Sequence, residues 1–419
     1  MTEQLLQYIW QFQFFNLNKL QTTDNQSISI VHPGTLNTNQ GPDFLNAKIN
    51  LGNTLWAGSI ELHLFSSQWN VHKHSADKNY KNVVLHVVWK EDEELQLPFP
   101  TLVLQERIST VLLNRYSDMM SNQAFVPCHK HLPSIRSITL TAWKERLLVE
   151  RLQGKASYIN NLLLQSNFHW EEIFWWMISR NFGITLNSEA FEVIARSIPV
   201  NILAKHKQQI IQLEALLMGQ AGLLDNNCIG DYPSLLKKEY KFLKKKYALV
   251  SPAVNLLFMR MRPANFPSVR LAQLAALVQH SHHLFSTILE EFSLKEIENL
   301  LQVTANDYWH YHYTMDDEAS YKPKVLGKQM IQNIIINTIV PMLYAHGFYN
   351  NNEATKNKAL QWLEQVSAEQ NHITKGFVKL GLQNKSAFDS QALIQMKNEY
   401  CNQKRCLQCA VGARILKME

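Results

Sequence analysis

Apolar and polar positions follow two different periods along the chain. In the first quarter, residues 3–15 have the apolar spacing of a helix, and the segments after them alternate as β-strands do. Glycine, proline and asparagine separate these segments, and a connection of about seventeen residues precedes the fourth of them. We expect that fourth strand to be buried on both faces except for His86. The predicted strands are residues 27–31, 47–51, 54–65, 83–89 and 102–104.

Beyond Cys128 the apolar positions recur with the period of a helix, and no linker rich in glycine or serine marks the change. We therefore predict an α+β protein whose parts pack together. It has a small α/β module over residues 1–132, a large, mainly α-helical region over 133–400, and a cysteine segment, 401–419, packed back on the boundary. The helix-patterned segments are residues 137–180, 187–198, 205–224, 234–249, 268–302, 327–346, 355–370 and 389–400.

Composition narrows the class of protein without fixing its partner. A chain of 419 residues is too long for one ordinary core, and 46% hydrophobic residues indicate a globular protein. A formal charge of +6 permits a polyanionic partner such as nucleic acid but does not require one. We find neither a stretch with the length and apolarity of a membrane-spanning helix nor a secretory signal at the start. We therefore expect a cytoplasmic protein with no membrane partner.

Two carboxylates on neighbouring predicted strands are the first candidate for chemistry. Asp43 lies in the sequence GPDF just before one strand, and Glu61 lies in GSIELH on the next. Alternate residues of a strand share a face, so Glu61 and His63 should point one way while the apolar residues between them face the core. A hairpin would bring Asp43 near the start of the Glu61 strand. Paired carboxylates suit Mg²⁺ or Mn²⁺; the alternative is a plain hairpin with a turn aspartate and a surface glutamate.

This arrangement resembles the PD-(D/E)xK nuclease superfamily, in which Pro-Asp at one strand end is followed by Glu-x-Lys on the next. The resemblance covers about the first hundred residues and implies a helix–strand–strand–strand–helix–strand core. It also implies that Asp43 and Glu61 hold a catalytic divalent metal. His63 stands where the family has the lysine that orients the attacking water. Lys48 or Lys73 could instead supply that charge.

Histidines are dense in the same part of the chain. Four of them, His63, His72, His74 and His86, fall within 24 residues. Together with Glu61 they could form a transition-metal site, because imidazole is a good ligand for such ions. Alternatively, His72 or His74 could serve as a general acid or phosphate contact beside Mg²⁺. Taken alone, these two are as well explained as surface histidines on a loop.

The C-terminus carries a second candidate metal site. Cys401, Cys406 and Cys409 have the spacing C-x4-C-x2-C, and Cys128 is the natural fourth ligand. Zn²⁺ or a [4Fe–4S] cluster would suit such a structural site; the alternative is a set of reduced, unligated thiols. Some nucleases of the superfamily use such a cluster as a staple, but there the lone cysteine precedes the nuclease motifs. Cys228 is expected to be an ordinary thiol.

Basic and aromatic residues in the helical region are candidates for binding nucleic acid. Lys244 and Lys245 belong to a basic helix with interleaved aromatics. Arg260, Arg262 and Arg270 surround a Pro-Ala-Asn-Phe-Pro loop ahead of a helix N-terminus, where backbone amides favour anions. A solvated lysine face and arginines that tie helices together are the alternative. The aromatic run at residues 309–313 could stack bases or form a packed corner, and we favour packing.

Segments along the whole chain also resemble an uncharacterised bacterial domain-of-unknown-function family, number 2851. They are residues 41–44, 58–63, 69–74, 262–267 and 401–409. That resemblance implies no activity. Three hypotheses therefore stand: a metal-dependent nuclease, a catalytically inactive nucleic-acid-binding protein on a nuclease-like fold, and a histidine/carboxylate metallohydrolase of a small substrate. Salt-sensitive binding to DNA or RNA would separate the first two from the third.

Overall fold

The computed structural model describes residues 1–225, 230–259, 262–281, 283–291 and 293–417, which form two compact units. The first unit comprises Met1–Trp143, Lys379–Leu382 and Met396–Glu419, and it contains the only sheet among the described residues. The second comprises Lys144–Val378 and Gln383–Gln395 and is helical. The α+β class predicted from the sequence is confirmed. The C-terminal cysteine segment belongs to the first unit.

The sheet joins an antiparallel half to a parallel half. Its order is β1-β3-β4-β5-β6, with the short β2 paired to β3. The pairings β1–β3 and β3–β4 are antiparallel, whereas β4–β5 and β5–β6 are parallel. β4 is therefore fixed by hydrogen bonds on both sides. The strands are β1 (Ile28–His32), β2 (Thr35–Leu36), β3 (Phe44–Leu51), β4 (Thr54–Phe65), β5 (Val83–Lys90) and β6 (Thr101–Val103).

Two features explain how β5 lies parallel to β4. The connection between them crosses over through α2 (Gln68–Val71) and two 3-10 turns, His74–Ala76 and Lys78–Tyr80. Gly58 allows β5 to approach, because a Cβ there would lie 2.4 Å from a methyl group of Val84. The expectation that His86 is the exposed position of β5 is wrong, since its side chain is fully buried.

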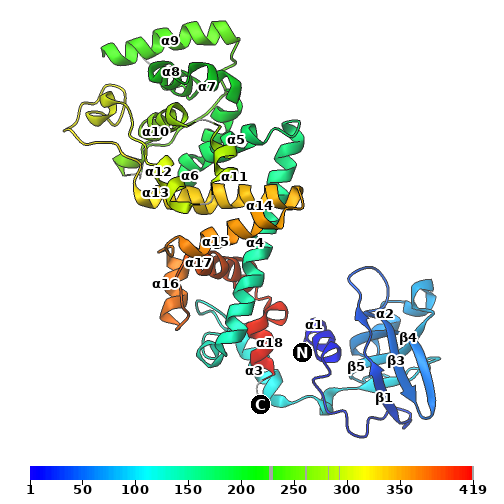
Figure 1. Ribbon diagram of the computed structural model, residues 1–419. Helices are drawn as coiled ribbons and strands as arrows, with labels where there is room; N and C mark the ends of the chain where they lie inside the picture. The colour runs from blue at the N-terminus through cyan, green and yellow to red at the C-terminus, as the bar shows by residue number, and fades with distance from the viewer. Residues whose placement is uncertain (226–229, 260–261, 282, 292, 418–419) are drawn as a thin grey trace. The chain divides into compact units, whose positions relative to one another are not determined.

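Helix α1 (Glu3–Gln11) packs against β4 and covers one face of the sheet (Figure 1). Its buried side carries Leu5, Leu6, Ile9 and Trp10, and the indole N–H of Trp10 donates a 2.9 Å hydrogen bond to the carbonyl of Pro33. The helix ends before the expected residue 15, because Gln13 has a left-handed φ of 53°.

In the rest of the first unit, the C-terminal segment packs against the residues that follow the sheet. Helices α3 (Thr110–Ser121) and α18 (Ala410–Leu416) are in contact. Lys397 donates a 2.6 Å hydrogen bond to the carbonyl of Phe125, and Lys404 donates one to that of Met120. These contacts place the cysteine-bearing turn near Cys128.

The second unit consists of helices, and the predicted segments 137–180 and 268–302 are each divided. The first breaks at Asn167 and Phe168, whose φ values are 51° and 63°. Between α13 and α14 the backbone forms a π-helical turn, Ile335–Ile339. The helices are α4 (Ser137–Gln165, which begins in the first unit), α5 (Trp170–Phe182), α6 (Ile184–Arg196), α7 (Val200–His206), α8 (Ile210–Gln220), α9 (Asp231–Tyr247), α10 (Pro267–His280), α11 (Leu284–Glu290), α12 (Leu294–Leu300), α13 (Lys328–Ile334), α14 (Val340–Tyr349), α15 (Glu353–Gln365), α16 (His372–Lys379) and α17 (Ala387–Gln395).

A buried carboxyl fixes Trp309, the first residue of the aromatic run 309–313, in the core of the second unit, while Tyr311 of the same run is exposed. Glu214 of α8 accepts hydrogen bonds from the Trp309 indole at 2.9 Å and the Tyr232 hydroxyl at 2.8 Å. Trp309 is fully buried, so it packs rather than presenting a stacking surface.

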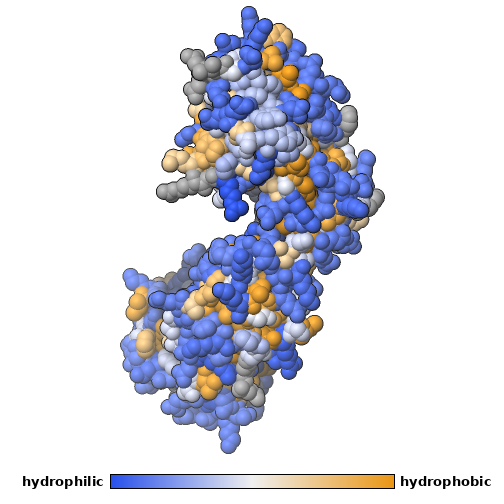
Figure 2. All heavy atoms as spheres, turned by 90° about the vertical axis from the view of Figure 1, so that its left-hand side faces the viewer, coloured by the Kyte–Doolittle hydropathy of each residue, from blue (hydrophilic) through white to orange (hydrophobic). Residues whose placement is uncertain are grey.

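In the part of the chain that the structure describes, no helix combines the length and apolarity needed to cross a membrane. Hydrophilic side chains cover most of the face drawn in Figure 2, and the hydrophobic areas on it are small and scattered.

Candidate metal centre

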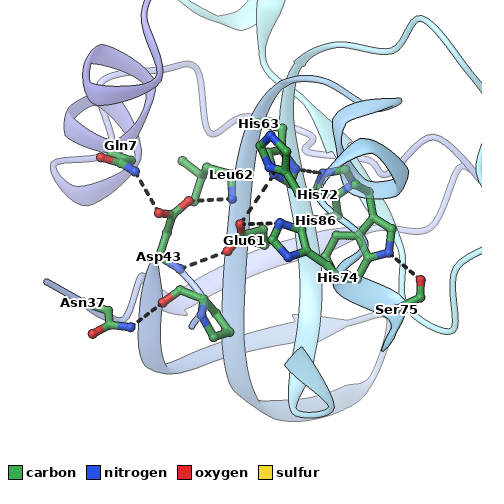
Figure 3. Close-up of polar contacts among 12 residues, drawn as sticks. Gln7, Asn37, Asp43, Glu61, Leu62, His63, His72, His74, Ser75 and His86 are labelled. Carbon is green, nitrogen blue, oxygen red and sulfur yellow. Dashed lines mark hydrogen bonds and ion pairs between the residues drawn. The ribbon is translucent and has the colours of Figure 1, made fainter. Parts of the chain in front are cut away.

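The antiparallel register of β3 and β4 places the two predicted carboxylates side by side. Phe44 pairs with Ile60, so Asp43, just before β3, lies beside Glu61 (Figure 3). The Asp43 N–H donates a 3.0 Å hydrogen bond to Glu61 Oε2, and the Leu62 N–H donates one of 2.9 Å to Asp43 Oδ2. The carboxylates meet in the second half of β4 rather than near its start, because β4 continues well before this register point.

Asp43 positions Glu61 and has no carboxylate oxygen free of hydrogen bonds. Its second oxygen, Oδ1, accepts a 2.8 Å hydrogen bond from the Gln7 side chain of α1. Both carboxylate oxygens of Asp43 therefore already have donors. Because Glu61 Oε2 is engaged by Asp43, Oε1 is the atom that faces the histidines.

Two histidines contact that oxygen, and a third lies beside them. Glu61 Oε1 lies 3.5 Å from Nε2 of His63 and 3.3 Å from Nε2 of His74. Nδ1 of His72 lies 3.2 Å from Nε2 of His63. One ring nitrogen from each of these three histidines lies within 4.8 Å of the other two. Glu61, His63 and His74 are buried and His72 is exposed, so the centre opens to solvent on the His72 side. We call these four residues the histidine–glutamate centre.

The crossover connection is shaped so that two of its histidines reach the centre. Lys73, between them, has a left-handed φ of 58°, which reverses the chain after α2. The ring of Tyr80 stacks on that of His74 with centroids 3.9 Å apart. Trp69 is buried behind the rings and makes edge contacts with those of His74 and His86. Aromatic packing therefore positions the loop half of the centre, together with the contact between His74 and Glu61.

His86 lies behind the centre and not in it. It is adjacent to Glu61 in the parallel register, and its Nε2 lies 2.9 Å from Nδ1 of His63. Its own Nδ1 is buried, with no hydrogen-bond partner among the described residues. His86 can therefore orient the His63 ring and select its tautomer, as partners of ligating histidines do. That His86 is itself a ligand stays a prediction, whereas its contact with His63 is what the structure shows.

Burial sets the charge of the centre. Burial, followed by the repulsion from Asp43, raises the pKa of Glu61 well above its ordinary value, and burial also raises that of Asp43. Burial, followed by the neighbouring histidines, lowers the pKa of His63 to about 2. His63 is therefore neutral and cannot replace the positive charge of a lysine. The same burial favours the protonated form of Glu61, and a bound divalent cation would instead favour a carboxylate beside neutral imidazoles.

Neither of the two lysines suggested as alternatives lies against the carboxylates in the described structure. Lys48 and Lys73 are both exposed, and Lys48 pairs with Ala57, away from Glu61 in the register of β4. In the described ranges of the chain, no lysine or arginine forms an ion pair with Asp43 or Glu61.

The predicted nucleic-acid contacts have different surroundings. Arg260 lies outside the described residues, while Arg262 and Lys245 are exposed. Arg270 is buried and donates to Asn265 at 2.6 Å and to Gln273 at 2.8 Å, so its guanidinium is not on the surface. Lys244 donates a 2.6 Å hydrogen bond to the hydroxyl of Ser251.

The four predicted cysteines come together in the first unit. Cys128, Cys406 and Cys409 are buried and Cys401 is half-buried, and each carries a free thiol. Burial, followed by the presence of the other three, raises the pKa of Cys401. Cys228 lies outside the described residues.

One contributor to the site was missed from the sequence. Gln7 lies on a short amphipathic helix, where a polar residue on the exposed side carries no signal of its own. Only the packing of α1 on β4 brings it to Asp43.

Comparison with known proteins gives one match. Residues 3–372 match the family model described as "Protein of unknown function (DUF2851)". No curated protein and no solved structure matches the chain. The matched span includes the histidine–glutamate centre and Cys128 and ends before the three C-terminal cysteines.

Proposed function

The chain belongs to the DUF2851 family, and we propose that it is a metal-dependent hydrolase that cleaves phosphodiester bonds in nucleic acid. The observation that carries the proposal is the convergence of Glu61, His63, His72 and His74 on one small volume that is open to solvent on one side. We expect this histidine–glutamate centre to hold the metal.

The donor set favours a transition-metal ion such as Zn²⁺. Three imidazoles and one carboxylate suit such an ion better than Mg²⁺, which prefers oxygen ligands and retains several waters. Asp43 is a poorer ligand than the sequence pattern suggests, because both of its oxygens already accept hydrogen bonds. Mg²⁺ or Mn²⁺ held by Asp43 and Glu61 alone is therefore the second choice.

Each residue has a role that follows from its contacts. A bound divalent ion would supply Lewis-acid activation of water and of the phosphoryl group. Asp43 positions Glu61 by donating its N–H to Oε2, and His86 positions His63 through the contact at Nδ1. His72 lies on the exposed side, so a substrate can approach there without rearrangement of the sheet.

Three features support a phosphodiester as the substrate. Pro42-Asp43 directly precedes β3, and Glu61-Leu62-His63 lies on the adjacent β4, which agrees with the nuclease resemblance. The order of one helix, antiparallel strands, a crossover and a parallel strand agrees with it as well. The formal charge of +6 favours a polyanion. The crossover departs from the family pattern, because α2 has only four residues.

A second candidate is a metallohydrolase of a small substrate. Three histidines with an open position are typical of catalytic zinc sites that act on many kinds of molecule. The exposed edge at His72 is compatible with this alternative, and the geometry of the ligands alone does not select the substrate.

The test uses the full chain, depleted of metal and then reconstituted with Zn²⁺, Mn²⁺ or Mg²⁺. Each form is incubated with single- and double-stranded DNA and RNA and with a small aryl phosphodiester, and binding is recorded beside cleavage. Glu61→Gln removes the central carboxylate, and Glu106→Gln is the matched control at an exposed position. We expect zinc-dependent nucleic-acid cleavage that Glu61→Gln lowers by more than about 100-fold and Glu106→Gln leaves unchanged.

The other outcomes are separable. Cleavage of the aryl ester alone would favour the small-substrate hydrolase. Salt-sensitive nucleic-acid binding without cleavage would favour an inactive binding module. Protein that binds none of the three metals at the histidine–glutamate centre would refute the proposal itself.

A further inference from the structure

The C-terminal turn and the segment after α3 form a second site, independent of the histidine–glutamate centre. Three of its cysteines lie within nine residues of sequence, and the fourth is Cys128, more than 270 residues earlier. Lysine-to-carbonyl hydrogen bonds, from Lys397 to Phe125 and from Lys404 to Met120, hold the two segments together without using any thiol. The arrangement of the four cysteines therefore belongs to the fold.

The turn that carries Cys406 packs so closely on α18 that position 412 must be glycine. A Cβ on Gly412 would lie 2.1 Å from the carbonyl oxygen of Cys406, which is a backbone atom that cannot swing away.

The spacing of the sulfurs distinguishes two kinds of metal site. In a four-cysteine zinc site the Zn–S bonds of about 2.3 Å place the thiolates about 3.8 Å apart. Among the described residues, the group of three or more ligand atoms within 4.8 Å of one another consists of histidines and contains no cysteine. No three of the four thiols therefore lie within 4.8 Å of one another, so at least one pair in any three is more widely spaced than in a four-cysteine zinc site. A [4Fe–4S] cluster needs wider spacing, because each thiolate binds a different iron of the cube.

We propose that these four cysteines ligate a [4Fe–4S] cluster that fastens the C-terminal segment to the segment after α3. The ligands are Cys128, Cys401, Cys406 and Cys409. Four cysteines for four irons leave no open position, so the cluster is structural. The proposal does not depend on the function of the histidine–glutamate centre.

The test is metal analysis of the full chain produced with added iron and purified without oxygen. Iron, zinc and acid-labile sulfide are quantified, and visible absorption and electron paramagnetic resonance after reduction are recorded. We expect about four irons and four sulfides per chain. Cys406→Ser should lose most of both, whereas Cys228→Ser, a cysteine outside this set, should retain them.

Two results would overturn the proposal. One is stoichiometric zinc without iron or sulfide in the wild type, which would make the site a zinc site. The other is full cluster content in Cys406→Ser. If that variant fails to fold, the wild-type metal content and spectra still decide the question.

Discussion

Placing the same methyl group at two glycines should change stability in opposite directions. Gly412→Ala would put a Cβ 2.1 Å from the Cys406 carbonyl oxygen and 2.9 Å from its carbon. Both are backbone atoms, so the turn or helix α18 must move. Gly154 lies in the interior of α4 and is exposed, and a Cβ there would meet nothing within 4 Å.

The magnitudes follow from these distances. At Gly412 the clash must be relieved by a shift of the backbone, and such overpacking costs about 1–3 kcal/mol. At Gly154 alanine gains about 0.5–1 kcal/mol, because glycine is the poorer residue in a helix interior. The two variants should therefore differ by roughly 1.5–4 kcal/mol.

Urea unfolding followed by far-UV circular dichroism, together with iron content, would measure the difference. We expect Gly412→Ala to unfold at lower urea with less bound iron, and Gly154→Ala to match or exceed the wild type. Equal shifts in the two variants, or a Gly412→Ala protein as stable as the wild type, would refute the packing argument.

Three further predictions concern charge and metal. Burial raises the pKa of Glu214 from 4.5 in the unfolded chain to about 7 in the folded protein, so the folded protein holds this proton more tightly. The resulting contribution to the free energy of unfolding is fully present below pH 4.5 and is lost as pH rises through 7. The loss is about 3 kcal/mol. Glutamine cannot lose a proton, so the urea midpoint of Glu214→Gln should fall less between pH 5 and 8 than that of the wild type. An equal fall of the urea midpoint with pH in both proteins would contradict this prediction. Removing metal with a chelator should lower the unfolding temperature of the wild type, by the equivalent of about 2.7 kcal/mol at a free metal concentration of 100 Kd. The unfolding temperature of Glu61→Gln should fall less on chelation than that of the wild type. An equal fall in the two proteins would mean that the metal binds elsewhere. His86→Ala should weaken zinc binding by about 10–100-fold in competition with a chromophoric chelator, because the His63 ring loses its partner. Unchanged affinity would remove His86 from the site.

Local periodicity predicted the parts of the site that lie on one strand. Alternation along β4 correctly put Glu61 and His63 on the same face, and the Pro-Asp step correctly put Asp43 beside them. The contribution of Gln7 could not be predicted, because it depends on how α1 packs on the sheet. The burial of His86 depends on β6 and the crossover covering β5, which no local pattern records.

The helical region shows the same limit. The helical period was identified correctly, but the break at Phe168 was not, because a left-handed φ at phenylalanine has no signature in the sequence. Arg270 was named as a candidate nucleic-acid contact, with a structural role as the alternative, and its burial against Asn265 and Gln273 agrees with the alternative. A charged residue ahead of a helix looks the same in sequence whether it faces solvent or the core.

The histidine–glutamate centre has two halves of different origin. Glu61 and His63 come from β4, which is hydrogen-bonded on both sides, whereas His72 and His74 come from the short crossover. Loops open more readily and faster than central strands. The rate of metal exchange should therefore follow the opening of the crossover, not the unfolding of the sheet. Metal can leave and return while the strand that carries Glu61 keeps its place.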